Sequence, residues 1–587
     1  MYLYSFSIYE YMLKTIINIH KHNSKKYNNF IIFKEIFILY IWRIKYTRYI
    51  FLPTIFFIFL SKFIELYQAD FLQKITERLN LDVNSDLKSL VISFLIITIL
   101  SYTLSEFPNY IFISRSIYSY RVKTVNTFTK LLYLEYYKFH SAYDMGDVQK
   151  IIERKGTAVF KIIDIIVLQC MPLFWFVTCA IVKIFYKMGL FIAIALAVSI
   201  SVYSVVTYII TVYREKIKRR YNIAQNRNAS QIYDSFSNLE VVKAFNRENR
   251  EIENFDECQK ESEKCTYNCY VSLYILSVIQ KYIIGFQTFI IICIGISEIS
   301  NKKMTPGMLV FYTSVNSSMC IHLYFLGHLF SELSQAFVDA SAEVLEREIK
   351  ENLIDIQGFH NSIIFRNVKI IHSTRIILQN INICIMKGEK IAIIGSNGIG
   401  KSTILKSILK FIDYDGEILI DGIELRNIKD SSIRKCISYI PQNTQLLKGT
   451  VRYNLTYGQE YINETKMVEI CKEFGIHDDI MKLENGYDTD VGASKDRLSG
   501  GERQKISFIR AMLNNGEIFL LDEPTSSLDI KSKDNLIEKI IKKRDKRINT
   551  LIMVVHDYRT LKYFDKIFFI EKNEARCITA EEAIKLS

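Results

Sequence analysis

The chain has 587 residues, of which 49% are hydrophobic, 13% aromatic and 23% charged. This composition excludes a mainly disordered chain, which would be poor in apolar and aromatic residues. Only 22 Gly and 6 Pro occur, which excludes a collagen-like chain, and the formal net charge of +13 excludes a solvated acidic protein. Seven glycines precede residue 351 and fifteen follow it, so two kinds of structure share the chain.

The N-terminal extension comprises residues 1–37. Its first 30 residues lack the compact apolar core and the small-residue cleavage site of a secretory signal. They are basic on balance and contain Ser, Tyr and Asn but no Arg. An organelle-targeting segment is therefore one interpretation of this extension.

Six apolar runs between residues 38 and 340 are each long enough to cross a bilayer, which takes about 20 helical residues. Lys62, Glu65 and Glu106 lie inside these runs and blur their edges. Very apolar soluble helices are the alternative, but six such runs in one chain disfavour them. The sequence therefore predicts an all-α polytopic domain in contact with the lipid bilayer, with spans at about 50–68, 90–115, 162–186, 189–213, 273–299 and 308–336.

Basic residues flank the spans unevenly. They gather before the first span and after the fourth, whereas the segment after the first span mixes acidic and basic residues. Because basic loops stay on the side of insertion, the N-terminus and everything after the sixth span are predicted to share one side. The same bias explains the +13 charge, so we expect no nucleic-acid partner.

Two polar segments, at about 116–161 and 214–272, contain no proline and are predicted to continue the spanning helices into water. The stretch 234–248 has Phe236, Leu239, Val242 and Phe245 at three-residue spacing, which indicates an amphipathic helix. Packing against neighbouring helices and docking onto another domain both remain open for it.

After a linker at 341–360, the sequence changes to short β-rich runs, glycine turns and soluble helices. IAIIGSNGIGKST (391–403) reads as a strand, a glycine loop and a helix. Backbone N–H groups of such a loop wrap phosphates, and the helix N-terminus adds partial positive charge. We expect Lys401 to reach the β- and γ-phosphates of ATP and Ser402 to bind Mg²⁺, with the rest of the site formed by Gly395, Ser396, Asn397, Gly398, Ile399, Gly400 and Thr403.

Two further motifs follow along the chain. IFLLDE (518–523) is an apolar strand that brings Asp522 within reach of Mg²⁺ and lets Glu523 polarise the water that attacks the γ-phosphate. LSGGERQKISFIRA (498–511) would begin a helix with Ser499, Gly500 and Gly501, which is a second anion-binding terminus. Two phosphate-binding ends without a duplicate domain suggest that two copies of the chain face each other.

With these motifs in order, residues 361–587 resemble the nucleotide-binding domain of ABC transporters, an α/β P-loop NTPase. The resemblance implies that Gln442 contacts Mg²⁺ and the membrane domain, that His556 contacts the γ-phosphate, and that Asp529 belongs to the ATP site. It also implies that His372 stacks on adenine, where a tyrosine is commoner. Because the catalytic set of Glu523, His556 and Gln442 is intact, we expect an active ATPase that uses ATP and Mg²⁺.

A membrane domain followed by one nucleotide-binding domain is the layout of exporter-type half-transporters. Several strings resemble the mitochondrial half-transporters that export a glutathione-linked sulfur compound for iron–sulfur protein assembly: YIW (40–42), IIERKGT (151–157), DSFSNLEVVKAFNRE (234–248), FLGHLFSELSQAFVD (325–339) and QNTQLLKGTVRYNLTYG (442–458). This resemblance implies a homodimer in the inner membrane of a mitochondrion or a related organelle, with the nucleotide-binding domain on the basic-loop side.

The same resemblance implies a pocket for a small anionic thiol-derived substrate. Arg214 and Lys218 lie one helical turn apart and could hold substrate carboxylates; alternatively, both cations merely mark the membrane edge. Lys218 stands where the family usually has arginine, and a lysine ammonium cannot form the bidentate hydrogen bonds that an arginine guanidinium forms with a carboxylate. The implied pocket residues are Tyr203, Arg214, Lys218, Ser277, Gln280 and Gly327.

Two other functions remain open on the sequence alone. An exporter of the same layout could move lipid, peptide or drug-like compounds. A nucleotide-gated channel or regulatory subunit is a different class, which the intact Glu523 and His556 disfavour.

Overall fold

The computed structural model describes residues 29–79, 87–143, 145–341, 344–345, 353–372, 375–442, 444–459, 463–491, 498–514, 516–524 and 550–585. The chain divides into two compact units. The membrane unit comprises residues 1–132 and 145–344, and the cassette unit comprises residues 133–144 and 345–587. The domain boundaries expected at residues 340 and 361 stay predictions.

The described part of the membrane unit is helical, and six of its helices are long and apolar enough to cross a membrane, as predicted. Four spans are single helices: α3 (Lys45–Leu79), α4 (Leu87–Tyr133), α8 (Leu190–Ser237) and α10 (Glu248–Ser300). The other two spans are composite: α6 (Met145–Asp164), η2 (Ile165–Cys170) and α7 (Met171–Met188) form one, and α11 (Pro306–Tyr324) and α12 (Leu326–Ser341) form the other. Shorter elements are α2 (Asn29–Ile36), η1 (Phe37–Trp42) and α9 (Leu239–Ala244).

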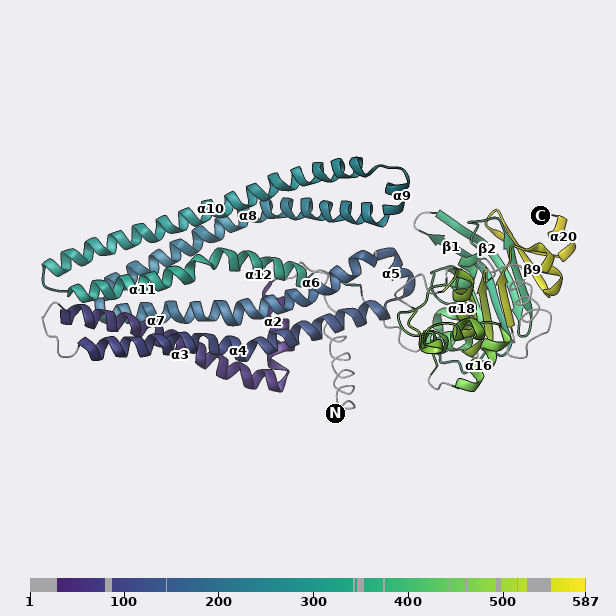
Figure 1. The fold of residues 1–587 in the computed structure, drawn as a ribbon, viewed down its shortest axis with the longest axis horizontal. Coiled ribbons are helices and arrows are strands. Elements are labelled where there is room, and N and C mark those ends of the chain that lie inside the picture. The colour runs from purple at the N-terminus through teal and green to yellow at the C-terminus, as the bar shows by residue number, and fades with distance from the viewer. Residues whose placement is uncertain are drawn as a thin grey trace. The chain divides into compact units, whose positions relative to one another are not determined.

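The predicted polar extension at 214–272 is helical apart from the turns on either side of α9, whereas the one at 116–161 is interrupted by the separate short helix α5 (Tyr136–Ala142). α8 has 48 residues and α10 has 53, which corresponds to about 70 and 80 Å at 1.5 Å per residue. A bilayer core is only about 30 Å thick, so most of each helix lies beyond it. The two helices run side by side and are joined at one end by α9 (Figure 1).

The amphipathic stretch 234–248 is not one helix. α8 ends at Ser237, α9 covers the middle of the stretch, and Asn246 adopts a left-handed φ of 51° before α10 begins. Phe236 and Phe245 are 70% and 72% exposed. The interpretation that these two rings pack against neighbouring helices of the chain is therefore wrong. Docking onto another domain stays a prediction.

The described residues of the cassette unit form two sheets. The four-stranded sheet is antiparallel and has the order β2-β1-β4-β5, with β1 (Ser362–His372), β2 (Arg375–Met386), β4 (Asp415–Ile420) and β5 (Ile423–Glu424). The six-stranded sheet has the order β10-β9-β3-β8-β7-β6. It consists of β3 (Lys390–Gly395), β6 (Ile437–Ile440), β7 (Ile518–Asp522), β8 (Thr550–Val554), β9 (Lys566–Glu571) and β10 (Glu574–Ile578), and only β10 pairs antiparallel.

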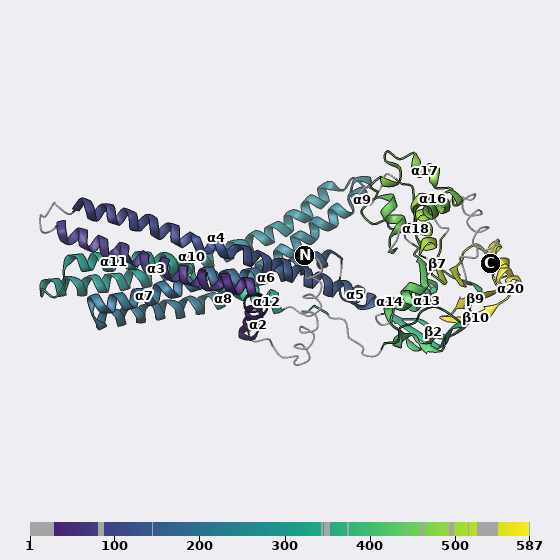
Figure 2. The ribbon, with the colours of Figure 1, turned by 90° about the horizontal axis from the view of Figure 1, so that it is seen from below.

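Helices complete the cassette unit. α16, α17 and α18 gather at one end and β2 lies at the other (Figure 2). The described helices are α5 (Tyr136–Ala142), α13 (Lys401–Ile408), α14 (Asp430–Cys436), α15 (Val451–Thr456), α16 (Glu464–Glu473), α17 (His477–Met481), α18 (Gly500–Leu513) and α20 (Ala580–Lys585), with short turns η3 (Leu425–Asn427), η4 (Gly486–Asp488) and η6 (Tyr558–Tyr563).

The central strands of the six-stranded sheet are buried on both faces, as parallel strands usually are. Successive side chains point to opposite faces of a strand. Ile391 and Ile393 accordingly belong to a core shared with α13 and the antiparallel sheet, whereas Ala392 and Ile394 belong to a core shared with α18. The sheet therefore fixes where β3 ends and where the phosphate loop begins.

Candidate functional site

The phosphate loop joins β3 to α13. β3 lies between β8 and β9, and all three run parallel. Gly395 has φ 149° and Gly400 has φ 109°, which residues with a side chain rarely adopt. A Cβ atom at Gly395 would also approach the carbonyl oxygen of Ile570 to 2.6 Å. The turn out of the strand therefore requires glycine.

Lys401 is the first residue of α13, and its side chain folds back over the loop. Its Nζ donates to the carbonyl oxygens of Gly395 at 2.9 Å and Ser396 at 3.0 Å. Burial lowers the pKa of Lys401, although Glu523 and Asp522 act in the opposite direction. Phosphate oxygens would offer this cation stronger, charge-assisted hydrogen bonds than the two carbonyls do.

Ser402 and Asp522 bring a hydroxyl and a carboxylate together at the end of β7. Ser402 Oγ donates to Asp522 Oδ1 at 2.8 Å, and Asp522 is buried. Burial raises the pKa of Asp522, because the charged form is poorly solvated there. Hard oxygen donors of this kind fit Mg²⁺, and the ion would neutralise charge on the phosphates when bound.

Glu523 is held by side chains from two distant segments. Gln442 Nε2 donates to Glu523 Oε2 at 2.8 Å, and His556 Nε2 lies 2.5 Å from Glu523 Oε1. The backbone of Glu523 has a left-handed φ of 50°. The structure thus brings the three predicted catalytic residues together.

Most of these groups line one cleft of about 630 Å³. Its described lining does not include Asp522 or the predicted loop residues Gly395, Ser396 and Ile399. Its wall contains Glu523, Gln442 and His556 together with six predicted loop residues and Ile377: the loop residues are Asn397, Gly398, Gly400, Lys401, Ser402 and Thr403. The cleft is the candidate ATP site.

Sequence reasoning missed two residues of this site. Ile377, on β2, lines the cleft, and a Cβ atom at Gly400 would meet its Cγ2 at 2.8 Å. Gln504 Nε2, on α18, donates to the carbonyl oxygen of Glu523 at 3.4 Å. An apolar strand residue carries no motif, whereas Gln504 lies inside the 498–511 string and could have been singled out. Asp529 and the side chain of His372 lie outside the described residues.

Ser499 caps the N-terminus of α18. Its Oγ accepts from Glu502 N at 3.3 Å, and Glu502 Oε2 accepts from Ser499 N at 2.7 Å. Among the described residues, neither Ser499 nor Gly500 nor Gly501 lines the cleft of the same chain. The predicted second anion-binding terminus therefore does not contribute to this cleft within its own chain.

The predicted substrate residues gather where α8, α10, α11 and α12 meet. Arg214 Nε donates to Ser272 Oγ at 3.1 Å, and Lys218 Nζ donates to Ser331 Oγ at 3.2 Å. Both cations are half-buried. Ser277 Oγ donates to Tyr324 Oη at 3.1 Å.

The other three predicted substrate residues are buried. Tyr203 Oη donates to the carbonyl oxygen of Leu323 at 2.7 Å, and Gln280 Nε2 donates to Thr207 Oγ1 at 3.1 Å. A Cβ atom at Gly327 would meet a methyl group of Leu276 at 2.9 Å. In this conformation these residues support the packing of the helices, and Arg214, Lys218 and Ser277 are the accessible members of the set.

Comparison with known proteins identifies both units. The ABC transporter transmembrane region matches residues 51–321, and the ABC transporter family matches residues 378–526. The iron-sulfur clusters transporter ATM1, mitochondrial, of Debaryomyces hansenii is 30% identical over 536 residues, which cover 88% of this chain and 77% of that protein. The chain belongs to the Atm1 family of ABC half-transporters.

Other comparisons agree with this assignment. ABC transporter B family member 24, mitochondrial, of Arabidopsis thaliana is 31% identical over 74% of this half-transporter and 66% of its own length. A solved bacterial Atm1-family ABC exporter with ATP bound shares the fold, with a TM-score of 0.82 and 24% identity over 92% of this chain and 96% of that one. This half-transporter is a multi-pass membrane protein and an ATPase that couples hydrolysis to transport.

Proposed function

We propose that this half-transporter works as a homodimer and exports a glutathione-linked or sulfur-containing anion that supports iron–sulfur cluster assembly. Its relatives are named as mitochondrial transporters of iron–sulfur clusters, which supports placement in the inner membrane of a mitochondrion or a related organelle. On this proposal the cassette unit lies on the side of the basic loops.

The observation that carries the substrate class is the cation pair on α8. Arg214 and Lys218 are four residues apart on one helix face, and their side-chain partners are the hydroxyls of Ser272 and Ser331. Among the described residues no carboxylate forms an ion pair with either cation, and Glu215 instead accepts from Ser334 Oγ at 2.6 Å. Two uncompensated cations in a membrane unit favour an anionic substrate.

The ATP site supports the dimer. Because Ser499–Gly501 does not line the cleft of its own chain, we propose that this turn covers the ATP that is bound to the phosphate loop of a second copy. Lys401 would then bind the β- and γ-phosphates from one side and the start of α18 would bind the γ-phosphate from the other. Glu523, oriented by Gln442 and His556, would accept a proton from the attacking water.

Replacement of both α8 cations tests the substrate assignment. In Arg214→Ala with Lys218→Ala, we expect glutathione, reduced or oxidised, to lose its stimulation of ATP hydrolysis, while basal hydrolysis stays within about twofold, because the ATP site is untouched. Loss of two charge-assisted hydrogen bonds should weaken the stimulating affinity by at least about tenfold. The measurement is ATPase activity of the lipid-reconstituted protein titrated with each form of glutathione.

The matched control is Lys216→Ala with Arg220→Ala, which removes two exposed cations from the same helix and should leave stimulation intact. Equal loss of basal and stimulated activity in the Arg214/Lys218 variant would contradict a substrate role. Stimulation by lipids or neutral drugs with no response to glutathione would instead favour the alternative exporter.

A further inference from the structure

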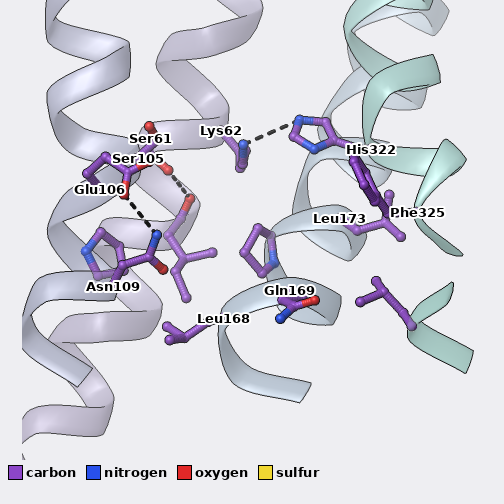
Figure 3. A pocket seen from close by; sticks show the side chains of 14 residues that line it. Ser61, Lys62, Ser105, Glu106, Asn109, Leu168, Gln169, Leu173, His322 and Phe325 are labelled. Carbon is purple, nitrogen blue, oxygen red and sulfur yellow. Dashed lines mark hydrogen bonds between the residues drawn. The ribbon is translucent and has the colours of Figure 1, made fainter. Parts of the chain in front are cut away.

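A second polar pocket lies inside the membrane unit, among α3, α4, α7 and the α11–α12 span. Its volume is about 350 Å³, and it is separate from Arg214 and Lys218, which do not line it. Figure 3 shows Ser61, Glu106 and Asn109 on one side and His322 on the other. All its lining residues fall in helices that can cross a membrane.

Lys62 contributes a cation to the pocket that is already compensated. Its Nζ donates to Glu65 Oε2 at 2.8 Å and lies 3.4 Å from His322 Nε2. His322 Nε2 is also 3.3 Å from Glu65 Oε1. Lys62 is only 7% exposed, so this trio is a closed ion pair with an imidazole beside it.

Glu106 is not compensated in the same way. Its carboxylate accepts from Asn109 Nδ2 at 3.1 Å, and no ion pair to it occurs within the described parts of the chain. Glu106 is exposed towards the pocket. A lone carboxylate in a membrane-spanning helix is costly, and such groups usually pair with a cation or mark a ligand path.

The hydrogen-bonding groups around Glu106 offer acceptors. Ser61 and Ser105 each donate their single hydroxyl proton to a helix carbonyl oxygen. Ser61 Oγ donates to Ile58 at 2.9 Å, and Ser105 Oγ donates to Tyr102 at 2.8 Å. Both hydroxyls therefore present only lone pairs to the pocket. Gln169 donates its amide to Asp164 at 3.0 Å, which leaves its amide oxygen as an acceptor.

The remainder of the wall is apolar. Pro172, Leu173 and Phe325 line the pocket beside these acceptors. The wall thus combines the Glu106 carboxylate, several acceptors and an apolar surface with the Lys62 cation, whose charge is offset by Glu65. A primary ammonium group has three donors, a positive charge and no acceptor, which matches the polar part, and a short alkyl body matches the rest.

We propose that this pocket binds a small primary organic ammonium ion, with its –NH₃⁺ group at Glu106 and its alkyl body against Pro172, Leu173 and Phe325. The site is additional to the proposed anion site and does not depend on it. Occupancy would supply the positive charge that Glu106 lacks among the described residues.

Binding can be followed through Trp175, which lies three residues after Pro172 with its ring 5.2 Å from that of Phe59. The chain has two tryptophans, so a Trp42→Phe background leaves Trp175 as the sole reporter. The full-length protein in lipid nanodiscs is titrated with n-butylammonium chloride. We expect a saturable change in fluorescence, with n-butanol and n-butyltrimethylammonium binding at least about tenfold more weakly because they lack the charge or the N–H donors.

In Glu106→Gln we expect n-butylammonium to bind at least about tenfold more weakly, whereas Glu106→Asp, which keeps the charge, should lose no more than about threefold. Glu257→Gln, at an exposed carboxylate of α10, is the matched control and should bind as the parent does. Equal affinities for n-butylammonium and n-butanol, or unchanged n-butylammonium affinity in Glu106→Gln, would overturn the proposal. The readout is binding, so it is independent of whether glutathione stimulates the ATPase.

Discussion

Glu523→Gln should lower ATP turnover by about 10²–10⁴-fold, the contribution typical of a general base. Glutamine keeps the size of the side chain and an oxygen acceptor, but it cannot accept a proton from water at neutral pH. Gln442 and His556 contact the Glu523 carboxylate at 2.8 and 2.5 Å, and the amide of Gln442 cannot act as a base in its place. ATP should still bind, because the phosphate loop and Ser402 are unchanged. The measurement is steady-state hydrolysis beside retention of radiolabelled ATP.

Glu571→Gln is the matched control. Glu571 ends β9 in the same unit and is exposed, so its loss of charge should leave hydrolysis within about twofold. Hydrolysis by Glu523→Gln at the parent rate would show that another group accepts the proton. Loss of ATP retention together with hydrolysis would show that Glu523 serves binding rather than proton transfer.

Lys401→Met should weaken ATP binding and slow hydrolysis. Methionine fills a similar volume at this buried position, so the fold of the loop should persist without its cation. The lost interaction is the one aimed at the β- and γ-phosphates, and removal of one such donor typically costs about 10²–10³-fold in rate. Equilibrium binding of a fluorescent ATP analogue should weaken by at least about tenfold.

Lys435→Met provides the control for the loss of a lysine, since Lys435 lies exposed on α14. It should bind and hydrolyse ATP as the parent protein does. A Lys401→Met protein that hydrolyses ATP normally would mean that the cleft lined by Lys401 is not the working ATP site.

The sequence predicted the architecture well where local patterns determine it. Six apolar runs became six candidate spans, and the strand–loop–helix at 391–403 follows the spacing of its glycines, all three of which have positive φ. The meeting of Gln442, Glu523 and His556 could not be derived from spacing, because they lie 81 and 33 residues apart. Only the resemblance to ABC transporters brought these three together before the structure did.

Other features depend on tertiary contacts that no local pattern encodes. The segment 133–144 belongs to the cassette unit, where the ring of Tyr136 stacks on Phe411 at a centroid distance of 4.4 Å. The sequence pattern instead predicts that 116–161 is one helical extension of the spans. Lys62 and Glu106 looked only like interruptions of apolar runs. Their role in one pocket depends on the packing of α3 against α4, α7 and α11.

On the proposed mechanism, one chain holds half of each working ATP site. This claim is tested by ATP turnover per chain in nanodiscs that contain one or two copies, counted by single-molecule photobleaching of a labelled protein. We expect discs with one copy to turn over ATP at least about tenfold more slowly per chain than discs with two. Equal turnover per chain in both populations would contradict it.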